Sequence, residues 1–386
     1  MRKVLLFLCI IVSILSCTSK VSQDTCKLEA MDKFLSFNIP DDVRMPQTSA
    51  FPFKEKGKWY LSFQNLPERE ILIYDVNTEE LVKRVYIDAE GNNSVTGGFG
   101  GYAIVDMEHI YIPSLYVSTI YVADTAGVIK RRIEFLKTPS GQSLVPPILY
   151  GGKPLTFIGD NLYIPQMLNG RLGEKALEQS FVKAVVDTVK KTVAALPMKF
   201  PPLITPKDFG TVAGTGAEYS CCYDGRHFIY SFFADEYLYK TTPDHKQVEK
   251  IRAKSEYIDE VTVFRSKEDD FQKLIKAQCE HASYGNILYD KYRKVYYRFA
   301  YPETEINDYS GDYLELLRSG KMSFSIMILD EELNVIGETL FPAYTYNPNL
   351  FYLCEDGLYL STSHFKRPDF DENVLRFQKI ELKETI

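Results

Sequence analysis

Three side chains with oxygen donors occupy comparable places in recurring segments of this sequence. Glu218, Asn286 and Asn349 each stand at the start of an apolar segment that we expect to form a β-strand. Carboxylate and amide oxygens bind a hard cation when several of them converge at about 2.3 to 2.6 Å. These three residues are therefore the candidate ligands of a metal-dependent hydrolase or lactonase, provided that the fold gathers their strands around one axis.

Five further residues could contact a ligand without performing chemistry. Asn92 and Asn93 lie in a glycine-rich stretch that lacks the lysine and the following helix of a phosphate loop. A flexible connector is the alternative interpretation of that stretch. His281 and His364 are the two histidines that we expect in long loops, and Arg298 is a cation that we place near the same region. For each of these three, an ordinary packing or ion-paired role is the alternative.

The element that would position these residues is a sequence repeat. The stretch GKWYLSF, Gly57 to Phe63, is the first of six related copies at intervals of about 50 to 70 residues. The equivalent central residues are Tyr60, Tyr111, Tyr163, Ile229, Tyr296 and Tyr359. Each copy follows an apolar strand and a polar turn of the kind that a short hairpin needs. Four antiparallel strands, repeated six times, predict an all-β protein with the fold of a six-bladed β-propeller.

The polarity of the strands favours a propeller over a sandwich or an up-and-down barrel. Segments such as NILYD and HIYIPS are apolar at nearly every position, as expected for strands covered on both faces. Segments such as LVKRVYI carry charges, as expected for the outermost strand of a blade. Ligands should then meet the face that carries the long loops, around the central channel.

The ring is expected to close through the N-terminal part of the chain. The sixth blade reaches only a third strand, and Lys33 to Ile39 alternates apolar and polar residues as a strand would. We therefore predict a single propeller domain over residues 33–386, closed by this N-terminal strand. A small helical insertion is predicted from Asp269 to Cys279, where apolar residues share one face, and a second helical segment could start at Arg171.

The first residues predict export and a lipid anchor. Arg2 and Lys3 precede an apolar run that is too short for a membrane span, which is typical of a signal peptide over residues 1–16. Cys17 follows a lipobox-like stretch and is the predicted lipidation site, because acyl chains on one residue anchor a protein stably. Residues 17–32 would then be a tether. An ordinary signal peptide with an incidental cysteine is the alternative.

Charge and cysteine content exclude several classes of protein. A net charge of −7 disfavours nucleic acid and anionic lipid headgroups as partners. The remaining cysteines lie on strand-like or helical stretches and are interpreted as buried thiols rather than as a disulfide framework. The sequence contains no CxxC pair, the spacing that would suggest a zinc site. We therefore predict no cofactor and no bound metal for the leading hypothesis.

The lipobox, the six repeats and the EGNN stretch at Glu90 together resemble a family of Bacteroidota lipoproteins of uncharacterised function, which carry a TolB-like six-bladed propeller domain. The resemblance implies a location in the cell envelope, on the outer membrane, and transfers no catalytic residue. The stretch from Thr18 to Gln23 has no acidic cluster, which favours a periplasm-facing anchor.

Two functions from different classes are open at this point. The leading hypothesis is a non-enzymatic binding or protein-interaction module that uses the long-loop face, with a small molecule or an envelope protein as partner. The alternative is the metal-dependent hydrolase or lactonase described above. Enzymatic activity is thus uncertain, and the fold alone does not decide it.

Overall fold

The structure is a computed structural model that describes residues 25–46, 49–65, 68–203, 217–266, 268–307 and 309–385. The predicted signal peptide of residues 1–16, Cys17 and the predicted tether up to residue 24 lie outside the described residues. None of the helices in the described ranges is long and apolar enough to cross a membrane.

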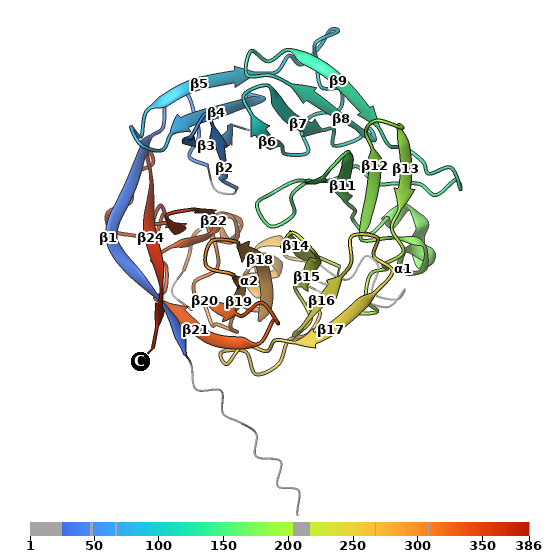
Figure 1. The fold of residues 1–386 in the computed structure, drawn as a ribbon. Helices are drawn as coiled ribbons and strands as arrows, with labels where there is room; N and C mark the ends of the chain where they lie inside the picture. Colours follow the sequence, from blue (N-terminus) through green and yellow to red (C-terminus); the bar gives the residue numbers. More distant parts are fainter. Residues whose placement is uncertain are drawn as a thin grey trace, which may run out of the picture.

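The described strands form six antiparallel sheets of four strands, arranged as blades around one axis (Figure 1). The first three blades, each from its inner to its outer strand, are β2 (Phe51–Glu55), β3 (Lys58–Asn65), β4 (Glu70–Asp75) and β5 (Leu81–Tyr86); β6 (Ala103–Asp106), β7 (His109–Pro113), β8 (Thr119–Ala123) and β9 (Ile129–Glu134); β10 (Thr156–Ile158), β11 (Asn161–Pro165), β12 (Lys183–Asp187) and β13 (Thr192–Ala195). The other three are β14 (Tyr219–Tyr223), β15 (Phe228–Phe232), β16 (Tyr237–Thr241) and β17 (Val248–Arg252); β18 (Ser283–Asp290), β19 (Val295–Tyr301), β20 (Phe324–Leu329) and β21 (Val335–Phe341); β22 (Asn347–Cys354), β23 (Gly357–Ser361), β24 (Val374–Glu384) and β1 (Cys26–Asn38). The six-bladed propeller predicted from the repeats is confirmed.

Burial follows the position of a strand within its blade. Every residue of β4, β8 and β15 is buried, because these strands have a neighbouring blade on each face. In the outer strands, half of the residues of β5 and most of those of β9 and β17 are exposed. Strands covered on both faces are thus apolar and outer strands are charged, which is the explanation that the sequence analysis gave for the difference in polarity.

The sixth blade is closed by the N-terminal strand, as predicted. β1 pairs antiparallel with β24, with Leu35 opposite Phe377 and Phe37 opposite Leu375. The strand begins at Cys26 rather than at Lys33, and a register shift near its middle accommodates the added length. The residues from Cys26 onward thus belong to the blade and not to the tether that we expected over residues 17–32.

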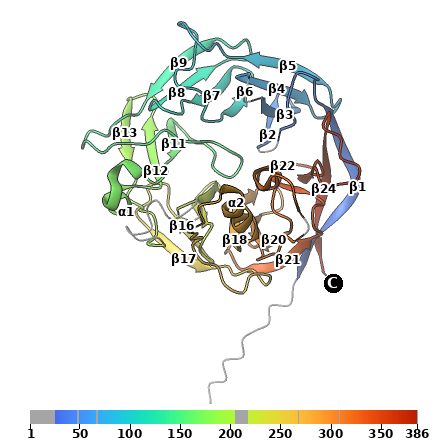
Figure 2. The same ribbon diagram turned by 180° about the vertical axis from the view of Figure 1, so that it is seen from behind.

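Short helices cover part of the long-loop face. α2 (Phe271–Glu280) matches the predicted insertion, and Asp270 caps it by accepting a hydrogen bond from the Lys273 N–H. The segment after residue 170 forms η1 (Gly170–Lys175) and the single turn α1 (Ala176–Gln179). The sequence did not predict α3 (Tyr313–Ser319), which packs against α2. Figure 2 shows α2 beside β18 of the fifth blade, on the side of the ring that faces the reader in that view.

Candidate functional site

A cavity of about 840 Å³ opens at the centre of the long-loop face. Its walls come from the strand starts and long loops of most blades, as the sequence analysis expected for a site on this face. The lining includes the segments 44–46, 99–101, 148–152, 283–286, 317–318 and 349 with 351. A volume of this size is in the range of pockets that hold a small molecule.

One loop crosses the channel and forms a wall of this cavity. Tyr150 to Lys153 connects the second and third blades, and in Figure 1 the green loop beside β11 extends toward the centre of the ring. The Tyr150 hydroxyl donates to the Tyr219 carbonyl at 3.1 Å, and the Gly151 N–H donates to Ser49 Oγ at 3.3 Å. The loop is thereby fixed to opposite sides of the channel.

Gly152 sits where no side chain would fit. Its carbonyl accepts hydrogen bonds from Ser220 Oγ at 2.7 Å and from the Cys221 N–H at 2.8 Å. A Cβ at this position would lie 1.9 Å from Asn286 Oδ1. The crossing loop therefore depends on glycine here, because the strands of the fourth and fifth blades approach its backbone so closely.

Two described residues of the lining have a buried polar atom without a hydrogen-bond partner, Gln64 at Nε2 and Asn286 at Oδ1. The Asn286 side chain lines the cavity and is 8% exposed, yet its Oδ1 receives no hydrogen bond from the described residues. A buried carbonyl oxygen without a donor costs free energy, of the order of 1 to 3 kcal/mol. This oxygen lies against Gly152 of the crossing loop, so the cost belongs to the close packing of the loop and not to an open ligand contact.

A cationic region lies on one side of the cavity. Arg44, Arg318 and Lys321 line it, and none of them is within ion-pair distance of a described carboxylate. Lys321 Nζ donates to the His281 carbonyl and to Ser283 Oγ, the latter at 3.2 Å. Burial lowers the pKa of Lys321 to about 8, because no described carboxylate compensates the charged form.

The opposite side is apolar. Phe99, Leu115, Ile148 and Leu149 belong to the loops of the second blade, which stands across the ring from the fifth. Leu115 is 36% exposed and Ile148 is 45% exposed, so the apolar lining continues to the surface at this rim. The cavity thus has a cationic end and an apolar end.

The proposed metal ligands do not meet. Asn286 and Asn349 line the cavity, but Glu218 does not, since its carboxylate pairs with the buried Lys153 amine at 3.2 Å. The Asn349 amide donates to the carbonyls of Leu317 and Arg318 at the end of α3. Among the described residues that line the cavity there is no Asp, Glu, His or Cys, so the oxygen and nitrogen donors that a catalytic metal prefers are not gathered there.

Arg298 lies inside the protein rather than near the mouth of the channel. It is fully buried between the fourth and fifth blades. Its guanidinium donates to Ser231 Oγ and to three backbone carbonyls, those of Asp235, Glu236 and Ala253. Burial lowers its pKa to about 10. This arginine joins two blades and offers nothing to a ligand.

The two histidines also serve local structure. His281 ends α2, its Nε2 is 2.9 Å from the Thr262 carbonyl oxygen, and its own carbonyl holds Lys321. It lines a second, shallower cavity and not the central one. His364 is fully buried, its Nδ1 accepts from the Lys366 N–H, and burial lowers its pKa to about 4.

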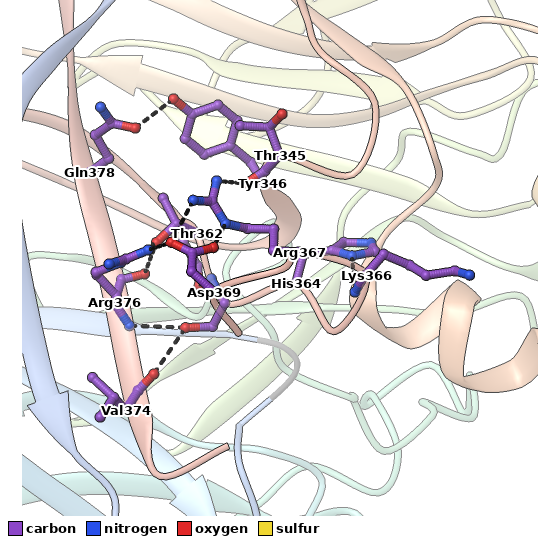
Figure 3. A network of polar contacts seen from close by, with 12 residues as sticks. Thr345, Tyr346, Thr362, His364, Lys366, Arg367, Asp369, Val374, Arg376 and Gln378 are labelled. Atoms are coloured by element: carbon purple, nitrogen blue, oxygen red, sulfur yellow. Dashed lines mark hydrogen bonds and ion pairs between the residues drawn. The ribbon is translucent and has the colours of Figure 1, made fainter. Parts of the chain in front are cut away.

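The basic loop after His364 is neutralised by its own carboxylate. Figure 3 shows Asp369 between the guanidinium groups of Arg367 and Arg376. Arg367 also donates to the Thr345 carbonyl at 3.1 Å. Both guanidinium groups are therefore ion-paired, and neither of these arginines lines the cavity.

Asn92 and Asn93 lie at the outer edge of the second blade. The Asn93 amide donates to the Gly127 carbonyl at 2.9 Å and accepts from the Ile129 N–H at 2.7 Å. The Asn92 carbonyl accepts a hydrogen bond from Arg132 at 2.6 Å. Neither asparagine lines the cavity, although Gly100 and Gly101 from the end of the same stretch do.

The sequence analysis missed the residues that give the cavity its character. Lys321, Arg318 and the crossing loop carry no motif, and they come together only through tertiary contacts. The signal that was available was the Gly151 and Gly152 pair in a long connection between blades, since paired glycines often mark a close approach of two backbones.

Comparison with known proteins gives the family. The family model described as a domain of unknown function, DUF4221, matches residues 21–340. The chain belongs to the DUF4221 family. Among solved structures, a member of DUF4221 from Bacteroides vulgatus superposes with a TM-score of 0.79 at 25% identity, over 94% of this chain and 100% of that one. A candidate exported protein from Bacteroides fragilis superposes with a TM-score of 0.55 at 10% identity, over 95% of this chain and 98% of that one, which shows a shared fold. No curated protein matches the sequence.

Proposed function

We propose that this DUF4221 protein binds a small molecule in the central cavity and performs no chemistry on it. The observation that carries the proposal is the cavity itself, which has a volume of about 840 Å³ and a mainly apolar lining with a few polar side chains such as Gln64, Lys321 and Asn349. Small-molecule sites combine an apolar lining with a few polar groups, and this cavity has both.

The composition of the lining supports binding over catalysis. Hydrolysis needs a nucleophile, a general base or a metal-bound water, and Ser, Cys, His, Lys, Tyr or carboxylates fill these roles. The described lining offers Ser49 and Ser283 as serine hydroxyls. Ser49 Oγ accepts from the Gly151 N–H, and Ser283 Oγ accepts from the Lys321 amine, whose pKa of about 8 leaves it mostly protonated at pH 7 and so a donor rather than a base.

The test is a thermal-shift screen against a panel of neutral, cationic and anionic small molecules. A ligand at about 100 times its Kd adds about 2.7 kcal/mol of stability. Gly151→Phe should abolish every shift that arises in the cavity, because a side chain there has only the Phe351 ring in contact, at 3.7 Å, and would occupy the open space. Gly170→Phe is the matched control, since that glycine lies in η1 with open space around it.

A panel without a stabilising compound, or shifts that persist in Gly151→Phe, would reject the proposal. A shift that is lost in both glycine variants would indicate damage to the fold rather than a filled cavity. Circular dichroism and the melting temperature of each variant without ligand separate these cases.

We also propose that the protein is held at the membrane by a lipid on Cys17, with residues 18–24 as the tether. The support is the lipobox-like stretch and the signal-like residues before it. Metabolic labelling with an alkyne fatty acid should mark the wild type and the Cys26→Ser variant but not Cys17→Ser. Cys26 is a suitable control because its thiol is buried at the start of β1. Labelling that persists in Cys17→Ser would contradict the anchor.

A further inference from the structure

We propose that the ligand of the central cavity is an amphiphile with one acidic group, which is bound by Lys321, and an apolar chain that extends toward Leu115 and Ile148. This inference rests on the proposed function and names the chemical class of its ligand. It follows from the distribution of charge, of hydrogen-bond partners and of apolar surface around the cavity.

Lys321 has donor capacity to spare. An ammonium group has three N–H donors, and the described partners of Lys321 are two neutral acceptors, the His281 carbonyl and Ser283 Oγ. The aromatic ring of Tyr301 lies 5.5 Å away. A partly buried ammonium without a counterion is unfavourable, and an anionic oxygen would supply both the charge and the missing acceptor.

Two other buried lysines show that this arrangement is specific to the cavity. Lys153 is 3% exposed and is neutralised by Glu218 at 3.2 Å. Lys183 is 1% exposed, lies between blades, and contacts Cys221 Sγ at 3.4 Å and the Phe228 ring at 4.3 Å. Neither of these amines lines the cavity. Of these three lysines, Lys321 is therefore the one that lines the open cavity and has no carboxylate partner among the described residues.

The surrounding charges favour an anion as well. Arg44 and Arg318 line the same cavity, whereas no described carboxylate does. The whole chain has a net charge of −7, so the positive cavity is a local departure from the overall charge. Such a concentration of one sign in a cleft attracts a ligand of the other sign.

The remaining lining indicates what the rest of the ligand looks like. Phe99, Leu115, Ile148 and Leu149 form an apolar region across the ring from Lys321, and two of them are exposed at the rim. Burying an alkyl chain against this region contributes about 0.8 kcal/mol for each CH2 group. A polar ligand such as a sugar acid would leave that surface unused, whereas an amphiphile would cover it.

The test uses isothermal titration calorimetry with four probes that share a ten-carbon chain, below the concentrations at which they form micelles. The probes are decanoate, decyl phosphate, decanol and decyltrimethylammonium. Decanoate should bind the wild type about tenfold or more tightly than decanol, as expected for a hydrogen bond to a charged group. Decyl phosphate tests whether the acidic group is a carboxylate or a phosphate, and the cationic probe should not bind.

The variants identify the lysine. Lys321→Met should reduce the affinity for decanoate to that for decanol, and Lys321→Arg should retain the preference. Lys183→Met is the control for the loss of a buried lysine elsewhere in the propeller, and it should keep the wild-type preference. Equal affinities for decanoate and decanol in the wild type, a preference that survives in Lys321→Met, or no binding of any probe would overturn the inference.

These outcomes are separable from failure of the proposed function. If decanol alone binds and Gly151→Phe blocks it, the cavity is a binding site but its ligand is not acidic. If the compound panel gives shifts that Gly151→Phe abolishes while all four alkyl probes fail, the proposed function stands and the amphiphile does not.

Discussion

The guanidinium carbon of Arg298 lies 3.6 Å from the centroid of the Tyr284 ring. Arg298 belongs to the interface between the fourth and fifth blades, whereas Tyr284 lines the central cavity. The Tyr284 hydroxyl in turn accepts a hydrogen bond from the Ser255 N–H at 3.0 Å. A buried cation therefore packs against a residue of the cavity wall without lining the cavity itself.

This relationship predicts a large loss of stability for Arg298→Met. The substitution removes the guanidinium donor from the carbonyls of Asp235, Glu236 and Ala253, of which the Glu236 carbonyl still accepts from the Ala253 N–H. Because each buried acceptor that is left without a donor costs about 1 to 3 kcal/mol, the free energy of unfolding should fall by about 3 to 5 kcal/mol in urea denaturation. Arg252→Met is the control, because Arg252 pairs with Glu236 at the surface and exposed ion pairs contribute little. Similar losses in both variants would show that the buried network has no special role.

The closing strand gives a second prediction. Phe37 is fully buried in β1 and packs edge-on against Phe63, Tyr74 and Phe377. Phe37→Ala should lower the free energy of unfolding by about 3 to 5 kcal/mol. Phe34→Ala removes the same ring from the same strand at a site that is 39% exposed, and its effect should stay within about 0.5 kcal/mol. If contacts other than those of Phe37 mainly close the ring of blades, the two variants should lose similar amounts of unfolding free energy.

The crossing loop, Tyr150 to Lys153, gives a third prediction. A Cβ on Gly152 would lie 1.9 Å from Asn286 Oδ1 and 2.9 Å from Ser220 Oγ, so Gly152→Ala must displace the loop or the strands. We expect a loss of about 1 to 3 kcal/mol, as for other overpacked sites. The neighbouring change Gly151→Ala meets no atom closer than 3.7 Å and should be nearly neutral. Urea denaturation of the adjacent pair is the measurement, and equal effects would contradict the close approach.

The pH dependence of decanoate binding is the fourth prediction. The pKa of Lys321 is lowered by burial to about 8, so above this pH the free protein increasingly carries a neutral amine. A bound anion favours the charged amine and raises its pKa, so the affinity should be constant from pH 6 to 7 and should fall as the pH rises through about 8. Calorimetry from pH 6 to 9.5 measures this fall.

Two groups near Lys321 have pKa values that burial moves further from that window. Burial raises the pKa of the Cys279 thiol to about 11 and the pKa of Tyr301 above its usual value. Lys321→Arg should therefore bind decanoate with little change up to pH 9.5. A fall of the same size in that variant would assign the titration to another group.

The sequence predicted those features of the fold that repeat or alternate. Six related strands fixed the number of blades, the alternation from Lys33 to Ile39 identified the closing strand, and the apolar face from Phe271 to Cys279 identified α2. Each of these patterns is local in the chain and reports burial directly. The start of β1 at Cys26 was missed because a register shift interrupts the alternation.

The cavity was less predictable because its residues have no common local pattern. Asn286 and Asn349 were found through their place at strand starts, whereas Arg298 was misplaced because sequence does not show which face of a strand turns inward toward a neighbouring blade. Lys321 became distinctive only when its neighbours proved to be carbonyl, hydroxyl and aromatic groups rather than carboxylates. Such a property belongs to the assembled site.

A crystal structure of the protein with the most stabilising compound of the panel tests the central claim most directly. We predict electron density for the compound inside the central cavity, in contact with Gly151 of the crossing loop and with the Phe351 ring. Density for the compound only at another site on the protein, with the central cavity empty, would contradict the account.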